Sequence, residues 1–211
     1  MGRSVFKGPL ARGLIAGAGV GLAALGLARV VWAAGAPVLT PAQLVPTLHK
    51  INLMEIEAGK MAREMGTSQA MKDYGDKLER DHAAAEDQLA GYAKRSGVDI
   101  QGPIPPAVTQ DLEKAQQQMN GLKTVIGPAF DRRFAQQMLG DHKKAIAIVD
   151  RSEPLIKDPQ LKGLLAVLEP TLRSHEQIAA NLLKMQQGVS LNEASAPPVA
   201  AQHLPPGAQG Q

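Results

Sequence analysis

Apolar residues recur every three or four positions through most of residues 41–187, and this spacing predicts amphipathic helices. Signals for helix starts and stops divide the region into four long helices and one lesser helix. The long helices are predicted at about 41–65, 68–96, 128–152 and 159–187, and the lesser one at about 107–124. Short connections within the first and last pairs make each pair antiparallel. The pattern predicts an all-α protein: an antiparallel four-helix bundle with an extra short helix between the second and third long helices.

Local residue choices mark the ends of these helices. Thr40-Pro41-Ala42-Gln43 combines an N-cap, a proline at the first helical position and the glutamine of a capping box. Thr67 or Ser68 is expected to cap the second long helix, and Asp158-Pro159 the last. Residues 97–106 contain three prolines and two glycines, which predicts a loop before the lesser helix.

The two ends of the chain differ in composition from the helical region. Residues 1–33 begin with basic side chains, continue with an apolar stretch at 13–28 and end in small residues, the order of a secretory signal peptide. We expect cleavage after Ala33, a linker at 34–40, the bundle at 41–187 and a disordered Pro/Ala/Gln-rich tail at 188–211. The predicted location is the periplasm. The alternative is an inner-membrane anchor at 13–28, although this stretch is short for a membrane span.

The net charge of +3 comes from the N-terminal segment. Four of the 23 basic residues precede residue 37, where there is no acidic residue, so 19 basic and 20 acidic residues remain. This balance argues against a nucleic-acid partner. No membrane partner is expected once a signal peptide is removed. The absence of cysteine excludes disulfides and thiol chemistry. The oligomeric state is not predicted.

Three histidines occupy positions at which the apolar pattern expects core residues. His82 follows Tyr74 and Leu78, and His142 follows Phe134 and Met138 at the same spacing. His175 has the same setting, within a series of apolar residues: Leu165, Leu168, Leu172, Ala179 and Leu182. The spacing predicts that three imidazoles, one from each of three helices, point into the bundle.

A carboxylate on the first helix is predicted to join these histidines. Glu55 continues the inward series Leu48, Ile51, Ala58 and Ala62. From the distance of each residue to its helix end, Glu55 and the three histidines all lie roughly 16–26 Å from one end of the bundle. Such a layer could bind zinc, copper or iron, with a water or substrate as a further ligand. Asp81, Asp141 and Glu79 are candidates for hydrogen bonds that orient the imidazoles, and the alternative for Asp81 and Asp141 is a surface salt bridge.

An ordinary di-iron centre is not predicted. Di-iron bundles carry two Glu-x-x-His strings and two further glutamates, whereas this chain has only Glu79-x-x-His82. Leu139 and Leu172 stand three residues before the other two histidines. No motif of a hydrolase or a phosphate-binding loop is present either, so no catalytic or organic-cofactor site is predicted.

Five strings of residues resemble a ferritin-like family of exported bacterial proteins, domain of unknown function 4142, often described as outer membrane proteins. The strings are Met54-Glu55-Ile56-Glu57-Ala58-Gly59-Lys60-Met61-Ala62, Leu78-Glu79-Arg80-Asp81-His82, Ala129-Phe130-Asp131, Gly140-Asp141-His142 and Glu169-Pro170-Thr171-Leu172-Arg173-Ser174-His175. The resemblance covers about residues 41–187 and implies a ferritin-like four-helix bundle. It implies no activity.

Three functions are compatible with these residues. The first is an exported periplasmic binding protein that holds a metal ion at the inward Glu/His layer. The second is a structural or envelope-stress interaction protein, in which the same side chains form a buried hydrogen-bond network without metal. The third is a metal-dependent redox enzyme. Whether the protein is an enzyme stays open, with binding the favoured interpretation.

Overall fold

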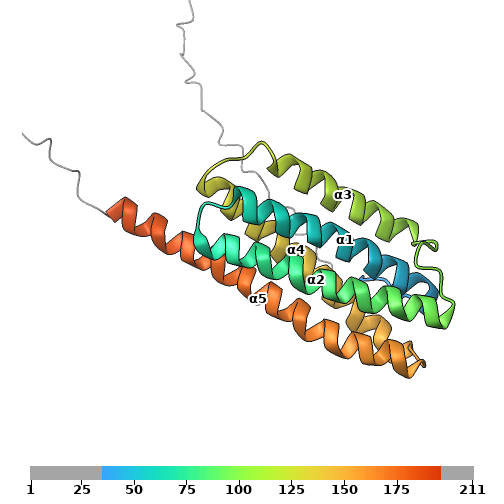
Figure 1. Cartoon of the computed structure of the whole chain (residues 1–211). Coiled ribbons are helices and arrows are strands. Elements are labelled where there is room, and N and C mark those ends of the chain that lie inside the picture. The colour runs from blue at the N-terminus through green and yellow to red at the C-terminus, as the bar shows by residue number, and fades with distance from the viewer. Residues whose placement is uncertain (1–34, 196–211) are drawn as a thin grey trace, which may run out of the picture. The chain divides into compact units, whose positions relative to one another are not determined.

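The computed structural model describes residues 35–195, with side chains described up to residue 186. In this part of the chain, five α-helices and one 3-10 turn account for the regular structure (Figure 1). They are α1 (Pro41–Met65), α2 (Gln69–Ser96), α3 (Pro106–Leu122), α4 (Pro128–Ser152), η2 (Glu153–Leu155) and α5 (Pro159–Ser195). The predicted all-α bundle, with a shorter helix between the second and third long helices, is confirmed.

The four long helices associate as two pairs. Helix α1 packs along α2 and α4 packs along α5, and contacts between α2 and α5 bring the pairs together. Helix α3 lies on the outside of the bundle, where it contacts α1 and α4 (Figure 1). This arrangement places α2, α4 and α5, the three helices that carry the inward histidines, around one core.

The predicted caps hold the helix starts. The backbone N–H of Thr40 donates to Oε1 of Gln43 at 3.2 Å, as the capping box requires. Ser68 Oγ accepts from the backbone N–H of Met71 at 3.2 Å. Asp158 Oδ1 accepts from the backbone N–H of Gln160 at 2.8 Å. Each contact satisfies a backbone donor that has no partner within its own helix.

The predicted end of the last helix is wrong. Helix α5 continues to Ser195, beyond Gln187, so residues 188–195 are helical and do not belong to an irregular tail. Gly188 does not stop the helix because a glycine in a helix interior costs only about 1 kcal/mol relative to alanine. The predicted signal peptide at 1–33 and the remainder of the tail at 196–211 lie outside the described residues. Among the helices that are described, none has the length and apolar character needed to cross a membrane.

Helices α1 and α2 approach each other closely at two glycines. A Cβ atom on Gly59 would lie 2.6 Å from the backbone nitrogen of Glu79 and 2.7 Å from the carbonyl oxygen of Gly75. A Cβ atom on Gly75 would lie 2.6 Å from the carbonyl oxygen of Gly59. Because the obstructing atoms belong to backbone, a side chain at either position would force the helices apart. The glycines therefore help to set how side chains of α1 meet those of α2.

A buried aspartate ties the start of α4 to the turn between α1 and α2. Asp131 is 2% exposed, and its carboxylate accepts four hydrogen bonds from Thr67 and Ser68. Two come from backbone N–H groups at 2.9 and 3.0 Å, and two from hydroxyl groups at 3.0 and 2.8 Å. Asp131 lies in one of the family-like strings, but its role could not be read from helix periodicity.

The apolar core has two parts, and the change from one to the other occurs at the inward histidines. One part contains Leu89 of α2, Ala145 of α4 and Leu172 of α5. The other part contains their counterparts on the far side of each histidine: Leu78, Met138 and Ala179. On each of these helices a histidine thus stands between the two apolar clusters. The bundle has a polar layer within its core.

Candidate metal centre

The three predicted histidines meet in the core. His82, His142 and His175 are 1%, 1% and 0% exposed, and come from α2, α4 and α5. Their ring centroids are 5.2–5.8 Å apart. One nitrogen can be chosen from each ring so that the three nitrogens all lie within 4.8 Å of one another. This is the geometry in which three imidazoles could share one ion.

The backbone of α4 determines which nitrogen of His142 carries its proton. Nδ1 of His142 lies 2.9 Å from the carbonyl oxygen of Met138, one turn earlier. A carbonyl oxygen only accepts hydrogen bonds, so Nδ1 is the protonated nitrogen. In a neutral imidazole the other nitrogen, Nε2, then presents its lone pair to the cluster.

Asp81 has the corresponding effect on His175. Nε2 of His175 lies 3.0 Å from Oδ2 of Asp81, which also accepts from Nζ of Lys77 at 2.6 Å. Although burial raises the pKa of Asp81, the hydrogen bonds from Lys77 and His175 lower it overall. The ionised carboxylate accepts the Nε2–H of His175, which leaves the lone pair on Nδ1. That Nδ1 lies 3.2 Å from Nε2 of His142.

An asparagine on α1 completes the set. Nδ1 of His82 lies 3.1 Å from Oδ1 of Asn52, an acceptor, so this nitrogen is the donor. Nε2 of His82 is buried and has no hydrogen-bond partner among the described residues. Each histidine therefore donates through one nitrogen and keeps the other unprotonated, and the unprotonated nitrogens of His142 and His175 face each other.

Burial keeps these imidazoles neutral. It lowers the pKa of His142 to about 3, helped by repulsion from His175. It also lowers the pKa of His82 well below the ordinary value, with repulsion from His142 and His175 acting in the same direction. The pKa of His175 is lowered by burial as well, although Asp81 opposes the shift. Neutral imidazole is the form that coordinates a metal ion.

Glu55 is buried but lies outside the cluster of ligand atoms. Its side chain is 7% exposed, and no carboxylate oxygen of Glu55 belongs to the group of atoms within 4.8 Å of one another. Burial, and then repulsion from Asp141, raise the pKa of Glu55 well above its ordinary value. Its Oε2 atom has no hydrogen-bond partner among the described residues. The structure thus brings together three of the four predicted ligands and leaves Glu55 outside their group.

The residues predicted to orient the imidazoles have different surroundings. Asp81 contacts His175, an imidazole on a neighbouring helix. Asp141 instead accepts a hydrogen bond from Gln137 at 2.6 Å, and burial raises its pKa. Glu79 pairs with Arg63 of α1 at 2.6 Å. Asp141 and Glu79 show no hydrogen bond to a histidine, because Asp141 contacts a residue of its own helix and Glu79 contacts α1.

Asn52 was missed by sequence reasoning, although a signal for it existed. It follows Leu48 by four residues and precedes Glu55 by three, so it belongs to the inward face of α1. It is 2% exposed, and a buried amide needs hydrogen-bond partners. A polar residue on an apolar helix face next to predicted histidines is the pattern that would have identified it.

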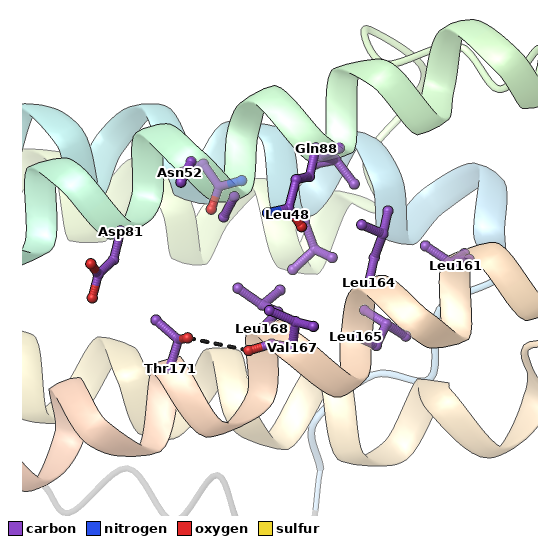
Figure 2. Close-up of a pocket in the computed structure, with 13 residues that line it drawn as sticks. Leu48, Asn52, Asp81, Gln88, Leu161, Leu164, Leu165, Val167, Leu168 and Thr171 are labelled. Atoms are coloured by element: carbon purple, nitrogen blue, oxygen red, sulfur yellow. Dashed lines mark hydrogen bonds between the residues drawn. The ribbon is translucent and has the colours of Figure 1, made fainter.

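A cavity of about 170 Å³ lies beside the centre, and Asn52 and Asp81 are both in its wall. Figure 2 shows Asp81 and Thr171 towards one end and leucine side chains of α5, including Leu161, towards the other. Two residues that hydrogen-bond to the histidines thus border a largely apolar space between α1, α2 and α5.

The family model that matches the chain is Domain of unknown function (DUF4142), over residues 29–182. The match spans most of the chain, so the protein belongs to this family. No curated protein and no solved structure matches the chain.

Proposed function

We propose that this member of the DUF4142 family is an exported periplasmic protein that binds one transition-metal ion between His82, His142 and His175. The family itself carries no assigned function, so the proposal rests on the chemistry of the site. Binding, and not catalysis, is the proposed role.

The observation that carries this proposal is the direction of the imidazole hydrogen bonds. The N–H of each ring donates to an acceptor outside the three rings: Met138, Asp81 or Asn52. The other nitrogen of each ring therefore has a free lone pair for a metal ion, namely His142 Nε2, His175 Nδ1 and His82 Nε2. In the neutral cluster no proton separates His142 Nε2 from His175 Nδ1, so two lone pairs face each other at 3.2 Å. A cation between them would turn this repulsion into coordination.

The spacing suits a metal ion. Zinc–imidazole bonds of about 2.0–2.1 Å in tetrahedral geometry place two ligand nitrogens about 3.3 Å apart. The 3.2 Å between the nitrogens of His142 and His175 is close to this value. The partnerless Nε2 of His82 is the lone pair that we propose as the third ligand. Nitrogen ligands of this kind bind zinc, copper and iron.

Glu55 is the proposed fourth ligand. It lies three residues after Asn52 on α1, so both side chains are on one face of the helix. A divalent ion among three neutral imidazoles would favour the ionised form of a nearby carboxyl group. Coordination would also give the buried Oε2 atom the partner that it lacks. A water molecule or a small ligand could complete the coordination in its place.

Metal content and thermal stability test the proposal. We expect purified mature protein to contain zinc, copper or iron, and added metal to raise the melting temperature at pH 7.5. The stabilisation should reach about 2.7 kcal/mol when free metal exceeds its dissociation constant a hundredfold. The double variant His82→Ala, His142→Ala should lose this gain. The variant His203→Ala, outside the described residues, serves as the matched control and should keep it.

The alternative predicts the opposite result. If zinc, copper, iron and manganese all leave the melting temperature unchanged, and no metal accompanies the purified protein, the histidines form a buried network that serves stability only. Because the measured quantity is the shift caused by metal, a lower starting stability of the double variant would not obscure the outcome.

Export is supported by the basic, apolar and small-residue order of residues 1–33. We expect mature protein that begins near Ala34 in the periplasmic fraction. Intact-mass measurement of the exported protein tests this directly. A mass that includes Arg3 to Arg29 would overturn it and favour the inner-membrane anchor.

A further inference from the structure

A chain of hydrogen bonds runs from the loop before α3 to the metal centre. It connects five side chains in the order Gln101, His49, Glu86, Asn52 and His82. The contact distances along it are 3.0, 2.6, 3.2 and 3.1 Å. His49 and Asn52 belong to α1, and Glu86 and His82 to α2. The chain therefore crosses between the two helices that meet at Gly59 and Gly75.

Each contact in this chain has one donor and one acceptor. The amide nitrogen of Gln101 faces Nε2 of His49, so that nitrogen accepts and Nδ1 of His49 donates to Oε1 of Glu86. The second carboxylate oxygen of Glu86 accepts from the amide nitrogen of Asn52. Oδ1 of Asn52 then faces His82 and accepts the proton on Nδ1.

The carboxylate of Glu86 decides which way the amide of Asn52 points. If the amide were rotated by half a turn, its oxygen would face Oε2 of Glu86, and two acceptors would lie about 3.2 Å apart without a proton. Its nitrogen would face His82 and demand the lone pair of Nδ1. His82 would then carry its proton on Nε2, the nitrogen that the metal requires.

We propose that Asn52, held in orientation by Glu86, is a positioning residue that keeps the proton of His82 on Nδ1 and so frees Nε2 for the metal. This inference rests on the proposed function. Asn52 does not touch the ion; it acts through the imidazole of His82. Hydrogen bonds to the outer nitrogen of ligand histidines fix the tautomer and ring orientation of metal sites in general.

Nitrogen NMR of the metal-free protein at pH 7.5 tests the tautomer directly. ¹⁵N shifts of imidazole nitrogens distinguish the protonated from the unprotonated position, and the His82→Ala spectrum assigns the signals of His82. We expect a single Nδ1–H tautomer in the parent protein and a mixture of both tautomers in Asn52→Leu. Glu86→Gln, which keeps the size of the side chain, should also give a mixture because a neutral amide no longer dictates the orientation of Asn52. Gln88→Leu, an exposed amide of α2 outside this chain, is the control and should match the parent.

Metal affinity gives the second measurement. Loss of a hydrogen-bond partner of a ligand histidine typically weakens metal binding about 10- to 100-fold, and we expect that range for Asn52→Leu. A parent protein whose His82 carries its proton on Nε2, or an Asn52→Leu variant with unchanged tautomer and affinity, would overturn the inference. If Asn52→Leu does not fold, Glu86→Gln decides the question by the same two measurements.

The outcome separates this inference from the proposed function. A protein that binds zinc or copper normally in both variants retains the metal site but has no positioning role for Asn52. A protein that binds no metal, yet shows the Nδ1–H tautomer and its loss in Asn52→Leu, retains the positioning role within a purely structural network.

Discussion

The metal-free protein should lose stability steeply as the pH falls from 7.5 to 5. His82 and His142 are neutral in the folded protein, because burial lowers their pKa values below the ordinary 6.5. In the unfolded chain the same side chains titrate near 6.5. Since the folded pKa is the lower one, the unfolded state takes up protons first. The free energy of unfolding therefore has its full value above about pH 6.5. It decreases as the pH falls towards the folded pKa, which is about 3 for His142.

The size of this loss of stability is set by the pKa of histidine in the unfolded chain, because the folded protein keeps the imidazole neutral. At pH 5, protonation lowers the free energy of an unfolded histidine by about 2 kcal/mol relative to a folded histidine that stays neutral. At pH 7.5 the same difference is less than about 0.1 kcal/mol. His142, whose folded pKa is about 3, therefore gives a loss of about 2 kcal/mol between these pH values, and His82, whose folded pKa is also lowered, adds to this loss. His175 is left out because its contact with Asp81 opposes the lowering of its pKa. A loss of this size is a large part of the roughly 5–15 kcal/mol that stabilises an ordinary domain.

Urea unfolding followed by circular dichroism at pH 7.5, 6 and 5, in the presence of a chelator, measures this loss. His142→Gln should show a pH dependence that is smaller by about 2 kcal/mol over the same range, because one of the two titrating groups is absent. A parent protein whose free energy of unfolding changes by less than about 1 kcal/mol between pH 7.5 and 5 would refute the reasoning. Equal pH dependence in the parent and in His142→Gln would refute it for that histidine alone.

Two further predictions concern the contacts that set the helix packing. Asp131→Ala should lower the free energy of unfolding by about 3–5 kcal/mol in urea titrations, because hydrogen bonds to a charged group are worth about 1.5–3 kcal/mol each and two backbone N–H groups lose their acceptor. A loss below about 1 kcal/mol would show that water replaces the carboxylate. Gly59→Ala should lower the melting temperature, with a destabilisation of about 1–3 kcal/mol, because its Cβ would collide with the backbone of α2. Gly163→Ala in α5, where a Cβ meets nothing within 4 Å, is the matched control and should be neutral or stabilising by up to about 1 kcal/mol. Equal melting temperatures for the two variants would contradict the close approach of α1 and α2.

The helices and their order follow from local sequence. Apolar spacing, the caps at Thr40 and Ser68, and the Gly127-Pro128 break each act within one or two turns, so a sequence alone suffices to place them. The same spacing puts His82 and His142 on the inner faces of their helices. The end of α5 could not be placed in this way, because a single glycine weakens a helix without stopping it.

The meeting of specific atoms is decided by tertiary structure. Counting residues from the helix ends places Glu55 and the histidines within a layer roughly 10 Å deep, which is coarser than the 4.8 Å within which the three histidine nitrogens lie. Within that layer, the close approach at Gly59 and Gly75 and the tie from Asp131 to the α1–α2 turn set how the helices face one another. These contacts join residues far apart in sequence, and helix periodicity carries no information about them.

The consequences appear at individual side chains. Asp81 reaches His175 on another helix, whereas Asp141, which precedes His142 in the same way, contacts Gln137 on its own helix. The sequence by itself determined that this protein is a helical bundle with inward histidines. Only the packing of the helices decided which ring nitrogens face one another, which acceptors receive the N–H of each ring, and that Glu55 lies outside the cluster. The reason is that a small rotation of a helix, or a shift of a few ångströms along its axis, changes every one of these contacts.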